Sequence, residues 1–205
     1  MISRKHKYIF IHVPKTGGNS VSRALLPYSE SHLEEAISPA GFGSGENFWT
    51  VDPELGRDKH FTVDMYAERM DIHEYFIFST VRNPLDWVVS LYFFRKQTGN
   101  TEEYSWLRAG TDEFDSNEFL QFLQSGEPTQ SSFFGTGQFP VHLLRFETLS
   151  DDFKEVCNRL KIRCHSLEKI NSSRRPAYSE ILDAELKNII AEIYDVDFRN
   201  FGYKL

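Results

Sequence analysis

The chain has 205 residues, of which 40% are hydrophobic and 26% are charged, so its composition is that of a globular protein. Its 23 Lys and Arg against 30 Asp and Glu give a net charge of −7, which argues against a broad basic surface for nucleic acid or anionic membranes. A small anion pocket is compatible with this charge, because it needs only a few local cations and backbone N–H groups.

Apolar runs, turn residues and helix-capping residues predict strands that alternate with helices. The predicted strands are 7–13, 75–81 and 141–146. The predicted helices are 19–26, 62–70, 83–96, 116–124, 151–160 and 179–194. The segments without clear periodicity are expected to be loops, and they are 27–58, 97–115 and 125–140; the aromatic tail 197–203 is expected to pack down. The alternation predicts an α/β fold with a central parallel sheet and helices on both faces.

Two sequence features bear on the compartment. Cys157 and Cys164 are the only cysteines, which excludes a disulfide framework and a Cys-rich zinc site. On a single helix they would lie about 10 Å apart, too far for a disulfide, so both are predicted to be reduced and structural. The apolar run 8–13 is too short for a signal-peptide core, and no apolar stretch is long enough to span a bilayer. We therefore expect a cytoplasmic protein.

The segment HVPKTGGNS, residues 12–20, follows the first predicted strand and leads into a helix. Gly17 and Gly18 lack the side chains that would keep an anion away from the backbone. Several N–H groups and the helix N-terminus would then face one point, which suits an anion, and Lys15 adds a positive charge. Three polar side chains add hydrogen-bond donors: Thr16, Asn19 and Ser20. The alternative is an ordinary turn between a strand and a capped helix.

A second candidate site lies in FSTVRNPLDWVVSLYFF, residues 78–94. Arg82 stands where the second predicted strand ends, and Ser90 lies on the following helix. The guanidinium of Arg82 can hold a phosphate through its fork of donors, and Ser90 can add a hydroxyl. The alternative is a structural Arg82 that pairs with an acidic side chain such as Asp86.

In this order and spacing, the two segments resemble the 5′-phosphosulfate loop and the 3′-phosphate motif of the sulfotransferase superfamily, which uses 3′-phosphoadenosine-5′-phosphosulfate as donor. Three further segments are similar to later parts of these enzymes: LLRFETLSDDFKEVCNRLKI, INSSRRPAYSE and DFRNFGY. The sequence is most similar to carbohydrate sulfotransferases and their small bacterial relatives, from about residue 8 to residue 203. The resemblance implies a P-loop-like three-layer fold and one sulfotransferase domain over residues 1–205.

The resemblance also assigns roles by position. The 5′ end of the donor would be held by the first segment, through Lys15, Thr16, Gly17, Gly18, Asn19 and Ser20. The family usually has Thr or Ser where this chain has Asn19. The 3′-phosphate would be held by Arg82 and Ser90. Arg174 and Arg175, in the C-terminal signature, would close over the nucleotide, with a solvated basic turn as the alternative.

His60 is the candidate general base, because family members often carry a His in this context and in some relatives it takes the acceptor proton. An acceptor hydroxyl must lose its proton as it attacks sulfur, and a neutral imidazole can take it near pH 7. A helix-capping or core His is the alternative. His12 is expected to be structural, and Glu147 could orient a substrate or bond the backbone.

These observations predict a sulfotransferase that moves a sulfuryl group to a hydroxyl, with a carbohydrate or glycan precursor as the expected acceptor. Lys15 would stabilise charge on the leaving oxygen, and neither a metal nor a nucleic-acid partner is expected. The sequence leaves open the acceptor's identity and the oligomeric state. One rival is a nucleotide kinase or phosphoryl transferase, which the missing Walker lysine disfavours, since Lys15 precedes the glycines. The other rival is a non-catalytic nucleotide- or glycan-binding module.

Overall fold

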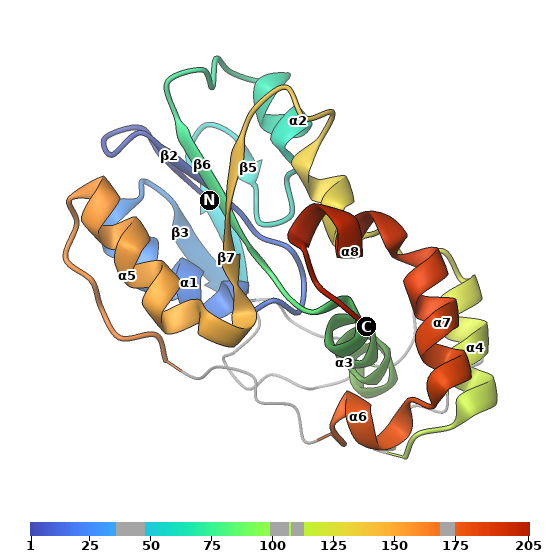
Figure 1. Cartoon of the computed structure of the whole chain (residues 1–205). Helices are drawn as coiled ribbons and strands as arrows, with labels where there is room; N and C mark the ends of the chain where they lie inside the picture. The colour runs from blue at the N-terminus through green and yellow to red at the C-terminus, as the bar shows by residue number, and fades with distance from the viewer. Residues whose placement is uncertain (36–47, 99–106, 108–112, 169–174) are drawn as a thin grey trace. The chain divides into compact units, whose positions relative to one another are not determined.

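The computed structural model in Figure 1 describes residues 1–35, 48–98, 107, 113–168 and 175–205. The chain forms two compact units, each described here by itself. The first unit consists of Met1–Ile37, Gly43–Arg82 and Gln130–Asn171. The second consists of Ser38–Phe42, Asn83–Thr129 and Ser172–Leu205.

The first unit is built on a four-stranded sheet in the order β1-β2-β6-β7. Its strands are β1 (Ile2–Ser3), β2 (Tyr8–Ile11), β6 (Phe76–Val81) and β7 (Val141–Arg145). Strands β2, β6 and β7 run parallel, with Ile77 opposite both Ile9 and Val141, and β1 pairs antiparallel with β2. The three predicted strands and the predicted central parallel sheet are therefore confirmed, while the two-residue β1 gave no periodic signal in the sequence.

Helices cover both faces of this sheet, because alternate residues of its buried strands point to opposite sides. On one face, Tyr8, Phe10 and Phe78 pack against α1 (Gly18–Leu25) and α5 (Leu149–Leu160), which lie together in Figure 1. On the other face, the isoleucines of β2 and β6 pack against α2 (Val63–Ala67) and the short 3₁₀ helix η3 (Gln130–Phe134). The result is the three-layer α/β arrangement that the sequence predicted.

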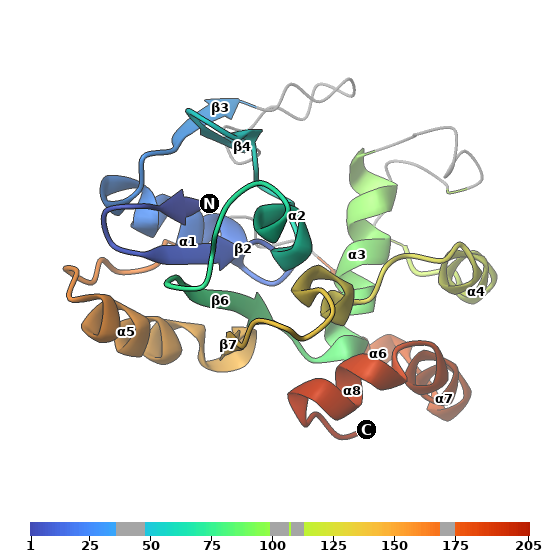
Figure 2. The same cartoon turned by 90° about the horizontal axis from the view of Figure 1, so that it is seen from above.

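The prediction that residues 27–58 form one long loop is wrong. This stretch contains a 3₁₀ turn, η1 (Leu26–Tyr28), and an antiparallel sheet of β3 (His32–Glu35), β4 (Phe48–Asp52) and β5 (Gly56–Arg57), of which Figure 2 shows β3 and β4 side by side. Strand β4 alternates between buried and half-buried residues, but two of its buried side chains, Thr50 and Asp52, are polar. The strand therefore alternates in burial, but its hydrophobicity does not alternate, so the sequence pattern does not reveal a strand.

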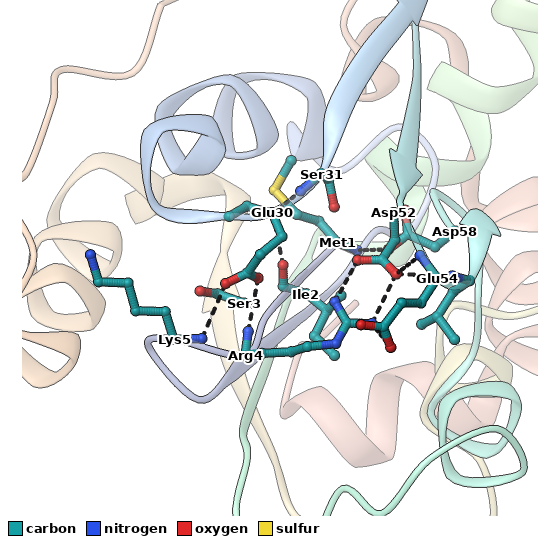
Figure 3. Close-up of polar contacts among 12 residues, drawn as sticks. Met1, Ile2, Ser3, Arg4, Lys5, Glu30, Ser31, Asp52, Glu54 and Asp58 are labelled. Carbon is teal, nitrogen blue, oxygen red and sulfur yellow. Dashed lines mark hydrogen bonds and ion pairs between the residues drawn. The ribbon is translucent and has the colours of Figure 1, made fainter.

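Those buried polar side chains are satisfied by ion pairs and hydrogen bonds. The Arg4 guanidinium donates two hydrogen bonds to Asp52, at 2.8 and 2.9 Å, as Figure 3 shows. Burial raises the pKa of Asp52, but the hydrogen bonds from Arg4 and from two backbone N–H groups outweigh it, so the pKa lies below its ordinary value. Asp58 accepts hydrogen bonds from the hydroxyls of Thr50 and Tyr66, both at 2.7 Å. These contacts fix the chain just ahead of His60.

The second unit is helical, and each of its described helices packs against at least one other. Its helices are α3 (Pro84–Thr98), α4 (Ser116–Gln124), α6 (Tyr178–Ile181), α7 (Ala184–Ile193) and α8 (Asp195–Phe201). Trp87, Tyr92 and Phe119 lie in its buried core. Among the residues that the structure describes, no helix is both long and apolar enough to cross a membrane.

Helix boundaries differ from the sequence predictions where a capping residue was misjudged. The predicted helix 179–194 is wrong: α6 ends at Ile181, and Asp183 starts α7 by accepting a hydrogen bond from the Leu186 N–H at 2.8 Å. The tail forms the further helix α8. Asp115 caps α4, one residue before the predicted start of that helix, and the Asn83 side chain at the start of α3 accepts from the Leu85 N–H at 2.9 Å. The predicted loop at 97–115 falls largely outside the described residues.

The two cysteines do not share a helix, so the spacing argument made from the sequence does not apply. Helix α5 ends at Leu160, and Lys161 adopts the left-handed conformation that reverses the chain. Both thiols are free, with Cys157 buried and Cys164 exposed. Burial is the main cause that raises the pKa of Cys157 to about 12, and a hydrogen bond with the Cys164 side chain adds to it. The Cys157 thiol therefore stays protonated.

Candidate functional site

The candidate residues of the first unit follow the carboxyl ends of its parallel strands. Strand β2 ends at Ile11, β6 at Val81 and β7 at Arg145. Neighbouring parallel strands end at the same edge of a sheet, which is where α/β proteins place their ligands. The sheet thereby gathers the segment after each strand, beginning with His12, Arg82 and Phe146, at one edge.

The turn between β2 and α1 has the backbone conformation of an anion-binding loop. Lys15 and Gly17 have positive φ angles of 63° and 85°, on either side of Thr16. Such alternation turns successive N–H groups toward a common point. Gly17 is the N-cap of α1, and within the described part of the chain no side chain caps the helix there. The positive end of the α1 dipole therefore lies at this turn, where the Ser20 N–H donates to the Gly17 carbonyl at 3.1 Å.

The Thr16 side chain holds the turn in place instead of facing a ligand. It is fully buried, its hydroxyl donates to the Val13 carbonyl at 2.8 Å, and it shares a hydrogen bond with the Thr80 hydroxyl at 2.6 Å. A contact from Thr16 to an anion would therefore come from its backbone N–H. Ser20 is buried in the first turn of α1, and Asn19 is half-buried.

The two glycines are also required by packing, which the sequence did not reveal. A Cβ on Gly17 would lie 2.8 Å from Leu149 Cδ2 and 3.2 Å from the Phe146 ring. A Cβ on Gly18 would lie 2.7 Å from two atoms of the His12 ring, closer than real side chains approach. Side chains that follow β2 (His12) and β7 (Phe146 and Leu149) therefore pack directly against the turn.

The structure brings Arg82 to this turn. Its Nη1 donates to the Lys15 carbonyl at 3.1 Å, and its guanidinium lies 4.0 Å from the centre of the Phe146 ring. Gln130 fixes the backbone of Arg82 from both sides, accepting from its N–H at 2.9 Å and donating to its carbonyl at 3.0 Å. Sequence reasoning missed Phe146 and Gln130 as supports. Phe146 stood within the segment LLRFETLSDDFKEVCNRLKI that resembles the family, but Gln130 gave no signal.

The remaining donor-site predictions fall in the second unit or outside the described residues. Ser90 is buried on α3. The Arg175 guanidinium, whose side chain is 8% exposed, donates to Asp86 and to the Pro176 carbonyl. Asp86 therefore has an arginine partner within its own unit. Arg174 lies outside the described residues. Roles for these residues in binding a nucleotide stay predictions.

His60 is held in one tautomer by the backbone. Its Nδ1 lies 3.2 Å from the His12 carbonyl, which can only accept, so Nδ1 carries the proton and Nε2 keeps the lone pair. The ring stands edge-on to His12 and Trp49, at 5.3 and 6.0 Å between ring centres. Although the residue keeps exposed surface, burial of its ring lowers the pKa of His60 to about 4, and the charge of Lys59 adds to this effect. The imidazole is neutral at pH 7.

Lys59, next to His60, lies in a different setting. Its ammonium is buried, donates to the Phe48 carbonyl and sits 4.4 Å from the centre of the Phe48 ring. Burial lowers the pKa of Lys59 to about 8, so it remains largely charged at pH 7. Among the described residues, no three His, Cys, Asp or Glu side chains are grouped so that they could hold a metal ion.

Comparisons with known proteins bear on the family and the fold. A family model described as "Sulfotransferase family" matches residues 1–204. Among solved structures, the chain is similar to mouse sulfotransferase SULT7A1 complexed with PAP, with a TM-score of 0.54 and 14% identity, over 97% of this chain and 86% of that one. At this identity the match speaks for the fold alone. No curated protein matches the sequence.

Proposed function

Since this chain belongs to the sulfotransferase family, we propose that it transfers a sulfuryl group from 3′-phosphoadenosine-5′-phosphosulfate to a hydroxyl group of a carbohydrate or glycan precursor. The product of this donor is adenosine 3′,5′-bisphosphate (PAP), and the similar mouse sulfotransferase is complexed with PAP. The carbohydrate acceptor, a single domain over residues 1–205 and a cytoplasmic location are parts of this proposal that rest on the sequence motifs.

The observation that carries the proposal is the contact between Arg82 and Lys15 at the start of α1, where no described side chain caps the helix. The hydrogen bond from Arg82 to the Lys15 carbonyl puts two cationic side chains on one turn whose N–H groups converge. A nucleotide with charged groups at both its 5′ and 3′ positions needs two such anchors. The donor set fits: backbone N–H groups and Lys15 suit the 5′ end, and the planar fork of Arg82 suits a phosphate.

Within this scheme, Lys15 meets the negative charge that develops on the leaving oxygen. The loop N–H groups hold the anion equally before and during transfer, whereas a lysine at the leaving oxygen acts most strongly in the transition state. Lys15 is part of the turn and has a positive φ. Hydrogen bonds from Arg82 to the Lys15 carbonyl and from Thr16 to the Val13 carbonyl hold this turn in place. Ser90, Arg174 and Arg175 keep the nucleotide-binding roles that the motifs predict.

His60 accepts the proton of the attacking hydroxyl in this proposal. Its Nδ1–H is committed to the His12 carbonyl, so Nε2 is the nitrogen available as a base. With a pKa of about 4 the unloaded ring is neutral but only weakly basic. A polyanionic donor bound nearby would raise the pKa of the ring toward the working pH, since a negative charge favours the imidazolium form. Donor binding would therefore strengthen the base.

The test is turnover of 3′-phosphoadenosine-5′-phosphosulfate, followed as PAP release in the presence of a panel of sugar acceptors. Lys15→Ala should lower kcat by about 100-fold while PAP affinity falls much less. Lys5→Ala, which removes an exposed lysine elsewhere in the same unit, is the matched control and should be unchanged. PAP binding without turnover on any hydroxyl acceptor would favour a binding module, and phosphoryl transfer from ATP would favour a kinase.

A further inference from the structure

His12, which the sequence suggested was merely structural, contacts both halves of the proposed reaction centre. It follows β2, and the residue is 5% exposed. On one side its ring occupies the space that a side chain at Gly18 would need, with Cδ2 and Nε2 each 2.7 Å from the position of the missing Cβ. The ring thus rests on the first residue of α1, where the proposed donor loop ends.

On the other side His12 meets His60 through both its backbone and its ring. Its main-chain carbonyl accepts the His60 Nδ1–H at 3.2 Å, and its imidazole stands edge-on to the His60 ring, with 5.3 Å between centres and 73° between planes. A hydrogen bond fixes the tautomer and one edge of His60, and among the described residues the packed rings restrain rotation about that bond. Trp49 provides the second ring of this restraint.

From this we propose that His12 is a positioning residue, whose ring sets the orientation of His60 relative to the glycine turn at the start of α1. The importance of this coupling for catalysis rests on the proposed function, but the coupling itself is a property of the unloaded protein. Any change that shifts the His12 ring must also change the packing of His60, because the Gly18 backbone leaves the ring no room on its other side.

The charges around the two rings allow the coupling to be measured. The groups that act on the His60 ring are Lys59, the His12 carbonyl and the amino group of Met1. Those that act on His12 are Lys59, His60 and the same amino group, and together with burial they hold the pKa of His12 well below its ordinary value. The titration of His60 in the unloaded protein therefore reports how tightly its ring is enclosed.

The structure also supplies a matched pair of variants. Within the described residues, the buried His12 Nδ1 has no hydrogen-bond partner, and an unsatisfied buried group of this kind costs stability. His12→Phe keeps a ring in place and removes that nitrogen, so it should fold at least as well as the wild type. His12→Ala removes the ring altogether, and Gly18→Ala pushes the ring toward His60. His142→Ala changes an exposed histidine of the same unit and is the control.

The experiment is an NMR titration of the His60 ring protons in the unloaded protein. In His12→Ala the His60 pKa should rise from about 4 by about one unit or more toward its ordinary value, because more water then surrounds a ring that is already partly exposed. His12→Phe and His142→Ala should titrate like the wild type, and Gly18→Ala should shift the His60 signals. Unchanged His60 signals in folded His12→Ala would overturn the inference. If His12→Ala does not fold, unchanged His60 signals in Gly18→Ala would overturn it instead.

A kinetic readout separates this inference from the proposed function. If sulfuryl transfer occurs, His12→Ala should lower kcat about tenfold or more with little change in the KM of the donor, and His12→Phe should restore most of the loss. A purely structural His12 would lower the melting temperature but leave kcat of the folded fraction unchanged, which would also overturn the inference. A shifted His60 titration without any transfer from the donor would keep the coupling and reject the proposed function.

Discussion

Gly17→Ala tests how the glycine turn is built, because its cost can be worked out from two separate effects. Gly17 has a φ of 85°, and holding an alanine in the left-handed region costs about 1–2 kcal/mol. The new Cβ would also lie 2.8 Å from Leu149 and 3.2 Å from Phe146. Leu149 can rotate its terminal methyl away, but Phe146 supports the Arg82 guanidinium at 4.0 Å and cannot move without disturbing it.

Gly56→Ala is the matched control for this variant. Gly56 has a similar φ of 75°, but a Cβ there would meet nothing within 4 Å, so its variant carries the backbone cost alone. At about 2–4 °C for each kcal/mol in a chain of this size, the backbone cost alone should lower the melting temperature of both variants by about 2–8 °C. Gly17→Ala should lose more than Gly56→Ala, and it alone should bind PAP more weakly, by about tenfold. Equal melting temperatures and equal PAP affinities in the two variants would refute the argument.

Three further predictions concern the scaffold. Thr50→Val removes a hydroxyl that donates to buried Asp58 at 2.7 Å, so unfolding in urea should show a loss of about 1–3 kcal/mol; a loss near zero would contradict the anchoring role of Asp58. Arg4→Met should cost stability at pH 6 and progressively less as the pH falls below about 3.9, because the lowered pKa of Asp52 gives stability that is present above its unfolded pKa of about 3.9 and lost as pH falls through the folded value. If the stability difference between Arg4→Met and the wild type does not shrink in acid, this ion pair is not its source. Lys7→Met, which removes an exposed ion pair with Glu74, is the control. Asp183→Ala should lower the melting temperature by about 2–4 °C through loss of the α7 cap, whereas Glu185→Ala in the same first turn should lower it less.

The sheet and most helices could be predicted because their signals are local. Strands β2 and β6 are buried on both faces and read as continuous apolar runs, and Asn83 followed by Pro84 marks the start of α3. The sheet of β3, β4 and β5 could not be predicted. Its inward side chains Thr50 and Asp52 are polar, and their partners come from distant parts of the chain, as Arg4 does for Asp52.

The sequence suggested candidate site residues, which stay predictions, but not the contacts that support them. Lys15, Arg82 and His60 follow from motifs in single segments. Their placement depends on contacts between strand ends: Phe146 beneath Arg82, Thr80 against Thr16 and His12 beside His60. No sequence pattern encodes these pairs, because each joins segments tens of residues apart. The sequence explained the glycines by access for an anion, and the structure adds the rings that press on them.

Calorimetric titration with PAP, AMP and ATP, on the wild type and on Arg82→Ala, tests whether Arg82 provides a second phosphate site. We expect the wild type to bind PAP at least tenfold more tightly than AMP, because in the proposed site Arg82 would hold the additional phosphate. A charge-assisted hydrogen bond is worth about 1.5–3 kcal/mol, and 1.4 kcal/mol corresponds to a factor of ten in Kd. Arg82→Ala should remove most of that difference while leaving AMP binding nearly unchanged. Equal affinities of the wild type for PAP and AMP, or tighter binding of ATP than of PAP, would contradict the account.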